Sequence, residues 1–250
     1  AVGAAADGGR VFLEDIQGYS LLETFHTAAQ LERAPQGTTI EGLRGLFRQR
    51  LHQENELSAD PAFFELLASR IPRVAEVEIL LRRGKIINET TQYHYDVVLH
   101  VGKAGKTVTP STWLDWTRDA GGTARLRALL AAKPASLGVR AIPNARLQLA
   151  IALRDAVRFS AGSSPLSALK LPPTGGADSE ELYALATELG YRASLRWEGD
   201  GQSGQMMALF ARNDQEGVAV FPPSAAATDL LKLANAPMTV ATGDGIAGEL

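Results

Sequence analysis

A short polar segment between two apolar runs carries the side chains best suited to chemistry. Residues 77–81 precede it and residues 95–101 follow it, and both runs read as strands. Within the segment, Asn88 and Glu89 supply an amide and a carboxylate, and Tyr93 supplies a phenol. At the carboxyl edge of an α/β sheet these groups would lie beside a ligand crevice. A solvated hairpin loop is the alternative, and spacing alone favours it.

Proton transfer is the chemistry that this segment could assist, because a carboxylate, an imidazole or a phenolate can act as a base. The catalytic candidates are Glu89, Asn88, Tyr93 and Tyr95. Glu89 is the first candidate for contact with an amine, and Asn88 would orient the substrate. Strand alternation places His94, Asp96, Val98 and His100 on one face, and Tyr93, Tyr95, Val97 and Leu99 on the other. Only one of these faces can line a site.

Asp15 is a further acidic candidate. Residues 10–13 form a predicted strand that ends in Glu14 and Asp15, and ligands bind beyond the carboxyl ends of parallel strands. Asp15 and His94 are therefore predicted on the substrate side, with Asn88 and Glu89 at the rim of the same cleft. The alternative is that Asp15 caps the helix that follows.

Composition limits the classes of function. The 250 residues have a net charge of −3, without the positive excess of a nucleic-acid-binding protein. There is no cysteine, and none of the four histidines forms an HxH or HxxxH pair, so no metal site is expected. No apolar run approaches the about 20 residues that span a membrane, and no signal peptide is visible. The expectation is a cytoplasmic α/β protein without a membrane or nucleic-acid partner.

Three amphipathic segments separate the first strand from the second. Residues 21–31, 40–56 and 58–69 show apolar side chains at helical spacing. Residues 10–102 are therefore predicted to form a strand, a helical insertion, and a terminal pair of strands. An antiparallel pair can be joined by a connection as short as the one here.

The remaining residues, 103–250, are predicted to form a small α+β subdomain, so that 1–102 and 103–250 are two domains. A helix over residues 179–189 precedes two strands that flank an Asp-Gly turn. Trp113 and Trp116 are three residues apart, which predicts that one helix face carries both and buries the joint between the two regions.

Several motifs together resemble the S-adenosylmethionine-dependent methyltransferase domain embedded in nonribosomal peptide synthetases. The family pattern is a basic residue with Arg-Gly, then Asn-Glu-Leu, then an aromatic residue-x-Tyr-Asp before a hydrophobic strand. The matching residues are Arg83, Gly84, Asn88, Glu89, Tyr93, Tyr95 and Asp96. DPAFF at 60–64 and GGRVFLEDI at 8–16 also fit, and weaker matches extend to Pro237.

The resemblance implies that residues 1–102 are the C-terminal half of a class I methyltransferase sheet, whose last strand runs antiparallel. It implies methylation of a carrier-bound aminoacyl or peptidyl intermediate, with the adjacent adenylation and carrier domains of the same polypeptide as partners. S-adenosylmethionine would be held in the complete domain by a glycine-rich turn and an acid. No such pair occurs in residues 1–102, so no cofactor is expected for this chain alone. The GxGxxG of Gly243, Gly245 and Gly248 leaves no room for a following helix.

The sequence also departs from the family pattern. Glu14-Asp15-Ile16-Gln17-Gly18 replaces Gly-Asp-x-Arg-Ser, and Thr90 replaces the leucine of Asn-Glu-Leu. Three functions stay open: a working methyltransferase, a truncated non-catalytic methyltransferase-like structural domain, and an epimerase-like tailoring domain. The nature of the methyl acceptor stays open as well.

The missing turns give a direct prediction. Calorimetric titration of this chain with S-adenosylmethionine is expected to show no micromolar binding, because the cofactor-binding residues of the resemblance are absent from it. A micromolar dissociation constant would contradict this reading.

Overall fold

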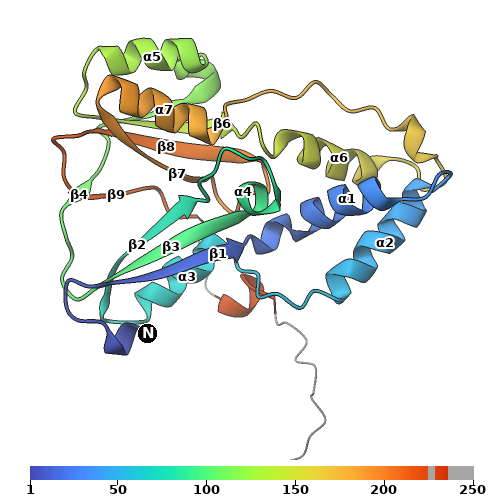
Figure 1. Cartoon of the computed structure of the whole chain (residues 1–250), viewed down its shortest axis with the longest axis horizontal. Helices are drawn as coiled ribbons and strands as arrows, with labels where there is room; N and C mark the ends of the chain where they lie inside the picture. The colour runs from blue at the N-terminus through green and yellow to red at the C-terminus, as the bar shows by residue number, and fades with distance from the viewer. Residues whose placement is uncertain (225–228, 236–250) are drawn as a thin grey trace, which may run out of the picture.

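The computed structural model describes residues 1–224 and 229–235, which form a mixed α/β fold with two main sheets, as predicted (Figure 1). Pro237 and the glycines at 243, 245 and 248 lie outside the described residues. No helix in the described ranges is long and apolar enough to cross a membrane.

The first sheet has the strand order β1-β3-β2. Strand β1 spans Arg10–Gln17, β2 spans Val74–Leu81 and β3 spans His94–Val101. The central strand β3 is antiparallel to both neighbours, which confirms the predicted antiparallel pair. Because β1 and β2 are thus parallel to each other, both end at the edge of the sheet where β3 begins.

Strand β3 buries one face in the core. Tyr95 and Val97 are fully buried, whereas Asp96 and Val98 are only half-buried. The Tyr95 ring packs edge-on against Trp197 of the second sheet, with 5.3 Å between ring centroids. Its hydroxyl donates to the carbonyl oxygen of Ala59 at 2.8 Å. The alternation read from the sequence is therefore correct, and it places Tyr95 in the core.

Strand β1 continues beyond its predicted end. Pairing with β3 is interrupted between Leu13 and Ile16 and then runs on to Gln17. This bulge accommodates Glu14 and Asp15, and Asp15 has a left-handed φ of +65°. A bulge leaves a residue unpaired and redirects its side chain, so two consecutive acids fit inside a strand. Asp15 consequently does not cap the following helix.

The helical insertion between β1 and β2 is confirmed. It comprises α1 (Leu22–Arg33), α2 (Ile40–His52) and α3 (Pro61–Ser69). The Thr39 hydroxyl accepts a hydrogen bond from the Gly42 N–H and caps α2. Helix α2 ends four residues earlier than predicted, which leaves Glu54 in the turn that follows. Helix α6 (Gln148–Phe159) packs along α1, beside α2 (Figure 1).

The second sheet has the order β5-β6-β8-β7 and forms the predicted α+β unit. Its strands are β5 (Trp113–Asp115), β6 (Ser136–Pro143), β7 (Tyr191–Trp197) and β8 (Gln205–Arg212), with helices α5 (Thr123–Ala131) and α7 (Ser179–Leu189). Strands β4 (Thr107–Val108) and β9 (Val218–Ala219) form a separate parallel pair. Single helical turns cover Val2–Ala4, Tyr19–Leu21, Trp116–Ala120, Leu166–Ala168 and Leu230–Lys232. Core residues of 1–102 and 103–250 pack in one cluster, and the division into two domains stays a prediction.

The prediction that one helix face carries both tryptophans was wrong. Trp113 lies in β5, which pairs in parallel with β6, whereas Trp116 begins the helical turn that follows. Trp113 packs on Phe221, with 5.5 Å between ring centroids, and Trp116 enters the main core. Because residues 113–115 are extended, the three-residue spacing does not put both rings on one helix face.

Residues 233–235 return to the start of α3. The side-chain oxygen of Asn235 accepts the Ser58 N–H at 2.8 Å, and its amide nitrogen donates to the Glu56 carbonyl oxygen at 2.8 Å. The Leu233 carbonyl oxygen accepts the Asp60 N–H at 2.7 Å. The turn between α2 and α3 is thus held by a segment more than 170 positions away.

Replacing Tyr95 by phenylalanine tests its place in the core. Tyr95→Phe should lower the free energy of unfolding by about 1–3 kcal/mol, because the buried Ala59 carbonyl loses its side-chain donor. Urea denaturation measures this change. Tyr19→Phe is the matched control, since the Tyr19 hydroxyl makes no hydrogen bond to any described residue; equal effects of both substitutions would contradict the assignment.

Candidate functional site

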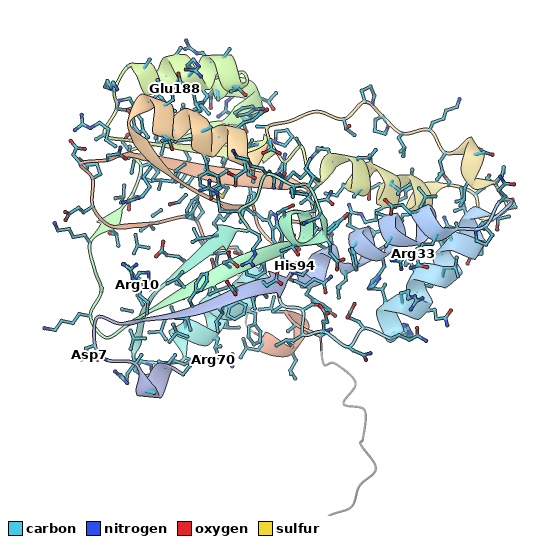
Figure 2. All side chains as sticks on the ribbon, in the orientation of Figure 1. Asp7, Arg10, Arg33, Arg70, His94 and Glu188 are labelled. Carbon is cyan, nitrogen blue, oxygen red and sulfur yellow. The ribbon has the colours of Figure 1, made fainter. Side chains whose placement is uncertain are left out.

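A cavity of about 480 Å³ lies at the end of the first sheet where β3 begins. Helix α1, the end of α2 and the short helix α4 (Glu89–Tyr93) form its walls. Three of the four predicted catalytic residues line it, namely Asn88, Glu89 and Tyr93. Figure 2 labels Arg33, at the end of α1, and His94, the first residue of β3, which lie at this side of the molecule.

Local sequence explains helix α4. The Asn88 side chain accepts the Thr91 N–H at 3.0 Å, and the Thr91 hydroxyl accepts the Asn88 N–H at 3.1 Å. This reciprocal capping box starts the helix and fixes the Asn88 side-chain oxygen. Asn88 therefore has a structural role, while its amide nitrogen stays available to donate a hydrogen bond. The capping also fixes the position of Glu89, the first residue of the helix.

Tyr93 is held as a neutral phenol. Its ring packs on Phe25, with 5.4 Å between ring centroids, and only 4% of the residue is exposed. Burial, together with the nearby charges of Glu32 and Glu89, raises the pKa of Tyr93 to about 12. The hydroxyl can donate a hydrogen bond but supplies no phenolate base at neutral pH. Glu32 and Glu89 both line the cavity with Tyr93.

His26 and Glu54 form a second polar pair at the cavity. His26 Nε2 lies 3.0 Å from a Glu54 carboxylate oxygen, and the other Glu54 oxygen accepts the Glu56 N–H at 3.0 Å. His26 lines the cavity although only 8% of it is exposed. His26 lies within α1. Its partner comes 28 positions later, from a turn that the sequence had assigned to a helix.

Arginine side chains complete the lining. Arg33 and Arg50 both line the cavity, and neither forms an ion pair within residues 1–224 and 229–235. Glu32, Arg33 and Arg50 were not predicted, since nothing in their local sequence distinguishes them from solvated residues of charged helices. The cavity therefore presents both positive and negative groups.

The remaining predicted residues lie outside this cavity. The Asp15 carboxylate accepts a hydrogen bond from His94 Nδ1 at 3.0 Å, and the Asp15 backbone N–H donates to the Asp96 carboxylate at 3.0 Å. Arg82 bonds Asp96 at 2.7 Å and joins the same network. This network is at the predicted end of the sheet, but it is not part of the cavity lining. Tyr95 is enclosed in the core, so the predicted set divides into three locations.

A larger cavity of about 680 Å³ lies between the two sheets. Two ion pairs lie in its lining, Lys106 with Glu216 and His100 with Glu78, and the lining residue Arg83 pairs with Glu180 beside it. Most of the charged side chains that line this space are therefore paired, which makes it a weaker candidate for a ligand site than the cavity beside Glu89. The described part of the chain contains no group of three or more His, Asp or Glu residues that could hold a metal ion.

Comparison with known proteins adds an independent observation. No family model matches the chain. It is 35% identical over 230 residues to chondramide synthase cmdD of Chondromyces crocatus, covering 89% of this chain and 6% of the synthase. It is 34% identical over 248 residues to a probable non-canonical nonribosomal peptide synthetase, CymA, of Salinispora arenicola, covering 98% of this chain and 3% of that protein.

A fungal protein gives the same result. The chain is 30% identical over 225 residues to the nonribosomal peptide synthetase asqK of Emericella nidulans, covering 85% of this chain and 9% of that protein. The chain thus spans less than a tenth of the length of each of these three relatives. It is homologous to segments of nonribosomal peptide synthetases.

Spectroscopic titration tests the grouping of Tyr93 with two carboxylates. Glu32→Gln and Glu89→Gln should each lower the pKa of Tyr93 from about 12, because each removes a negative charge that disfavours the phenolate. The difference in ultraviolet absorption between each protein and its Tyr93→Phe derivative reports this ionisation.

Glu181→Gln, an exposed position on α7, is the control and should leave the Tyr93 titration unchanged. The raised pKa of Tyr93 also determines how the stability of the fold depends on pH. The folded-state pKa of Tyr93 is raised, so its contribution to stability is complete below about pH 10 and falls as the pH rises towards 12. A Tyr93 titration that neither substitution shifts would contradict the grouping.

Proposed function

We propose that this chain is part of a tailoring domain of a nonribosomal peptide synthetase, and that it forms the substrate side of a methyltransferase acting on a carrier-bound aminoacyl or peptidyl intermediate. The observation that carries the proposal is the convergence of Asn88, Glu89 and Tyr93 on one cavity. The 34–35% identity to segments of peptide synthetases supports the context. The antiparallel central strand β3 supports the methyltransferase reading, since the resemblance implies such a strand.

The charge of the cavity suits an amine. Glu32 and Glu89 lie near the Tyr93 hydroxyl, and a substrate ammonium would be attracted to both carboxylates. The free amide nitrogen of Asn88 and the neutral Tyr93 phenol can donate hydrogen bonds to a substrate carbonyl. These groups would orient the amine, and orientation provides much of the acceleration in a transfer between two bound partners.

S-adenosylmethionine would supply the methyl group in the complete domain. The described part of this chain does not fit that cofactor. The glycine-rich turn of Gly199, Gly201 and Gly204 follows β7 but leads into strand β8 and not into a helix. It is also closely packed, since Cβ atoms at Gly201 and Gly204 would come within 2.9 Å of Trp197 and 2.4 Å of Ile151. Gly18, which follows β1, is packed against Trp197: a Cβ atom there would come within 2.8 Å of the indole ring. The residues described here therefore bind and orient the substrate. The adjacent adenylation and carrier domains remain the predicted partners, and the cytoplasm remains the predicted location.

Glu89→Gln within the synthetase tests the proposal. Turnover should fall about 100-fold, because the substrate ammonium loses the carboxylate that attracts and orients it. The stability of the fold should change little, because Glu89 is exposed. Methylated product is measured by mass spectrometry after incubation with the loaded carrier domain. Glu181→Gln is the matched control and should retain full turnover.

If the Glu89→Gln variant keeps its full turnover, Glu89 does not take part in the reaction. A synthetase that forms no methylated product, with its carrier domain loaded and S-adenosylmethionine present, would overturn the proposed function and favour the non-catalytic or epimerase-like alternatives.

A further inference from the structure

The pair of His26 and Glu54 has the arrangement of a general base and its positioning carboxylate. Their atoms lie 3.0 Å apart, and His26 is 92% buried while still lining the cavity. Glu54 is itself fixed, because its second oxygen accepts the Glu56 N–H. Hydrogen bonds between the 56–58 backbone and Asn235 hold the turn that carries it.

The hydrogen bond to Glu54 selects one tautomer of His26. A carboxylate oxygen can only accept, so Nε2 carries the hydrogen and Nδ1 carries the lone pair. Within the described residues Nδ1 has no hydrogen-bond partner, yet it is not enclosed by protein atoms. His94 differs here, since its unpaired Nε2 is completely buried away from the cavity.

The other cavity groups are less suited to accept a proton. Tyr93 is a neutral phenol whose pKa is about 12. Glu89 is a carboxylate, and an imidazole is intrinsically a stronger base than a carboxylate. The charged side chains that line the cavity with His26 are Glu32, Glu89, Arg33 and Arg50. Glu54 contacts the ring itself, with a carboxylate oxygen 3.0 Å from Nε2.

We infer that His26 Nδ1 accepts a proton from the ammonium group of the substrate, and that Glu54 is the positioning residue that keeps this nitrogen unprotonated beforehand. The inference rests on the proposed function and names the proton acceptor of the same cavity. The ammonium N–H bond breaks, its electron pair stays on the substrate nitrogen, and the proton binds Nδ1. The products are a neutral amine with a free lone pair and an imidazolium whose Nε2–H still faces Glu54.

The tautomer is the first test, and it uses this chain alone. In protein labelled with ¹⁵N-histidine, the neutral His26 ring should show a protonated Nε2 and an unprotonated Nδ1. Glu54→Gln should shift the ring towards the opposite tautomer, because the glutamine amide can donate to Nε2. Finding the hydrogen on Nδ1 in the unmodified chain would overturn the inference.

Methyl transfer in the synthetase is the second test. His26→Gln should lower kcat by about 100-fold or more with little change in KM, and Glu54→Gln should lower kcat by a smaller factor. The double variant should be no slower than His26→Gln, because Glu54 acts through His26. His52→Gln, an exposed histidine at the end of α2, is the matched control and should keep its kcat.

The outcomes of these experiments distinguish the proposed methyltransferase function from the role of His26 as proton acceptor. If the synthetase methylates its substrate and His26→Gln stays within twofold of the unmodified kcat, the inference is wrong and the proposed function stands. Additive losses in the double variant would also reject the positioning role of Glu54. If no methyl transfer occurs in the unmodified synthetase, the proposed function fails, and the inference fails with it.

Discussion

The central position of β3 is the constraint on which the rest of the structure depends. Its apolar face is sealed in the core by Tyr95, Val97 and Leu99, so its register cannot slip by one residue without exposing that face. Because β1 and β2 both run against β3, their carboxyl ends meet at one edge of the sheet. The capped helix α4 enters β3 at that edge, and this is why polar groups from distant parts of the sequence meet there.

Elements governed by local sequence were predictable. The strands 77–81 and 95–101, the three inserted helices and the helix over 179–189 follow from hydrophobic periodicity and from residues that favour helix starts. Elements decided by longer-range pairing were not predicted. Residues 113–115 form a strand because β6 lies beside them, and β1 continues through a bulge because β3 offers partners on both sides of it. In each case tertiary pairing overrides the local pattern.

The same distinction holds for the site. Asn88, Glu89 and Tyr93 are neighbours in sequence, and they were identified together from their residue types. The opposite wall consists of His26, Glu32 and Arg33 on α1, and its orientation depends on how α1 packs against α2 and α6. No spacing rule connects His26 to Glu54, which comes from a turn 28 residues later. The polar groups on the wall formed by residues 88–93 can thus be identified from local sequence. Those on the α1 wall are brought to the cavity by helix packing, which local sequence does not reveal.

The attachment of residues 233–235 beside α3 has a mechanical consequence. Asn235 bonds the backbone of Glu56 and Ser58, so tension applied to the chain beyond Asn235 reaches this turn before it reaches either sheet. The Glu56 N–H in turn holds the carboxylate of Glu54, the partner of His26. Asn235 is therefore connected to the His26 imidazole through only two intervening residues, Glu56 and Glu54.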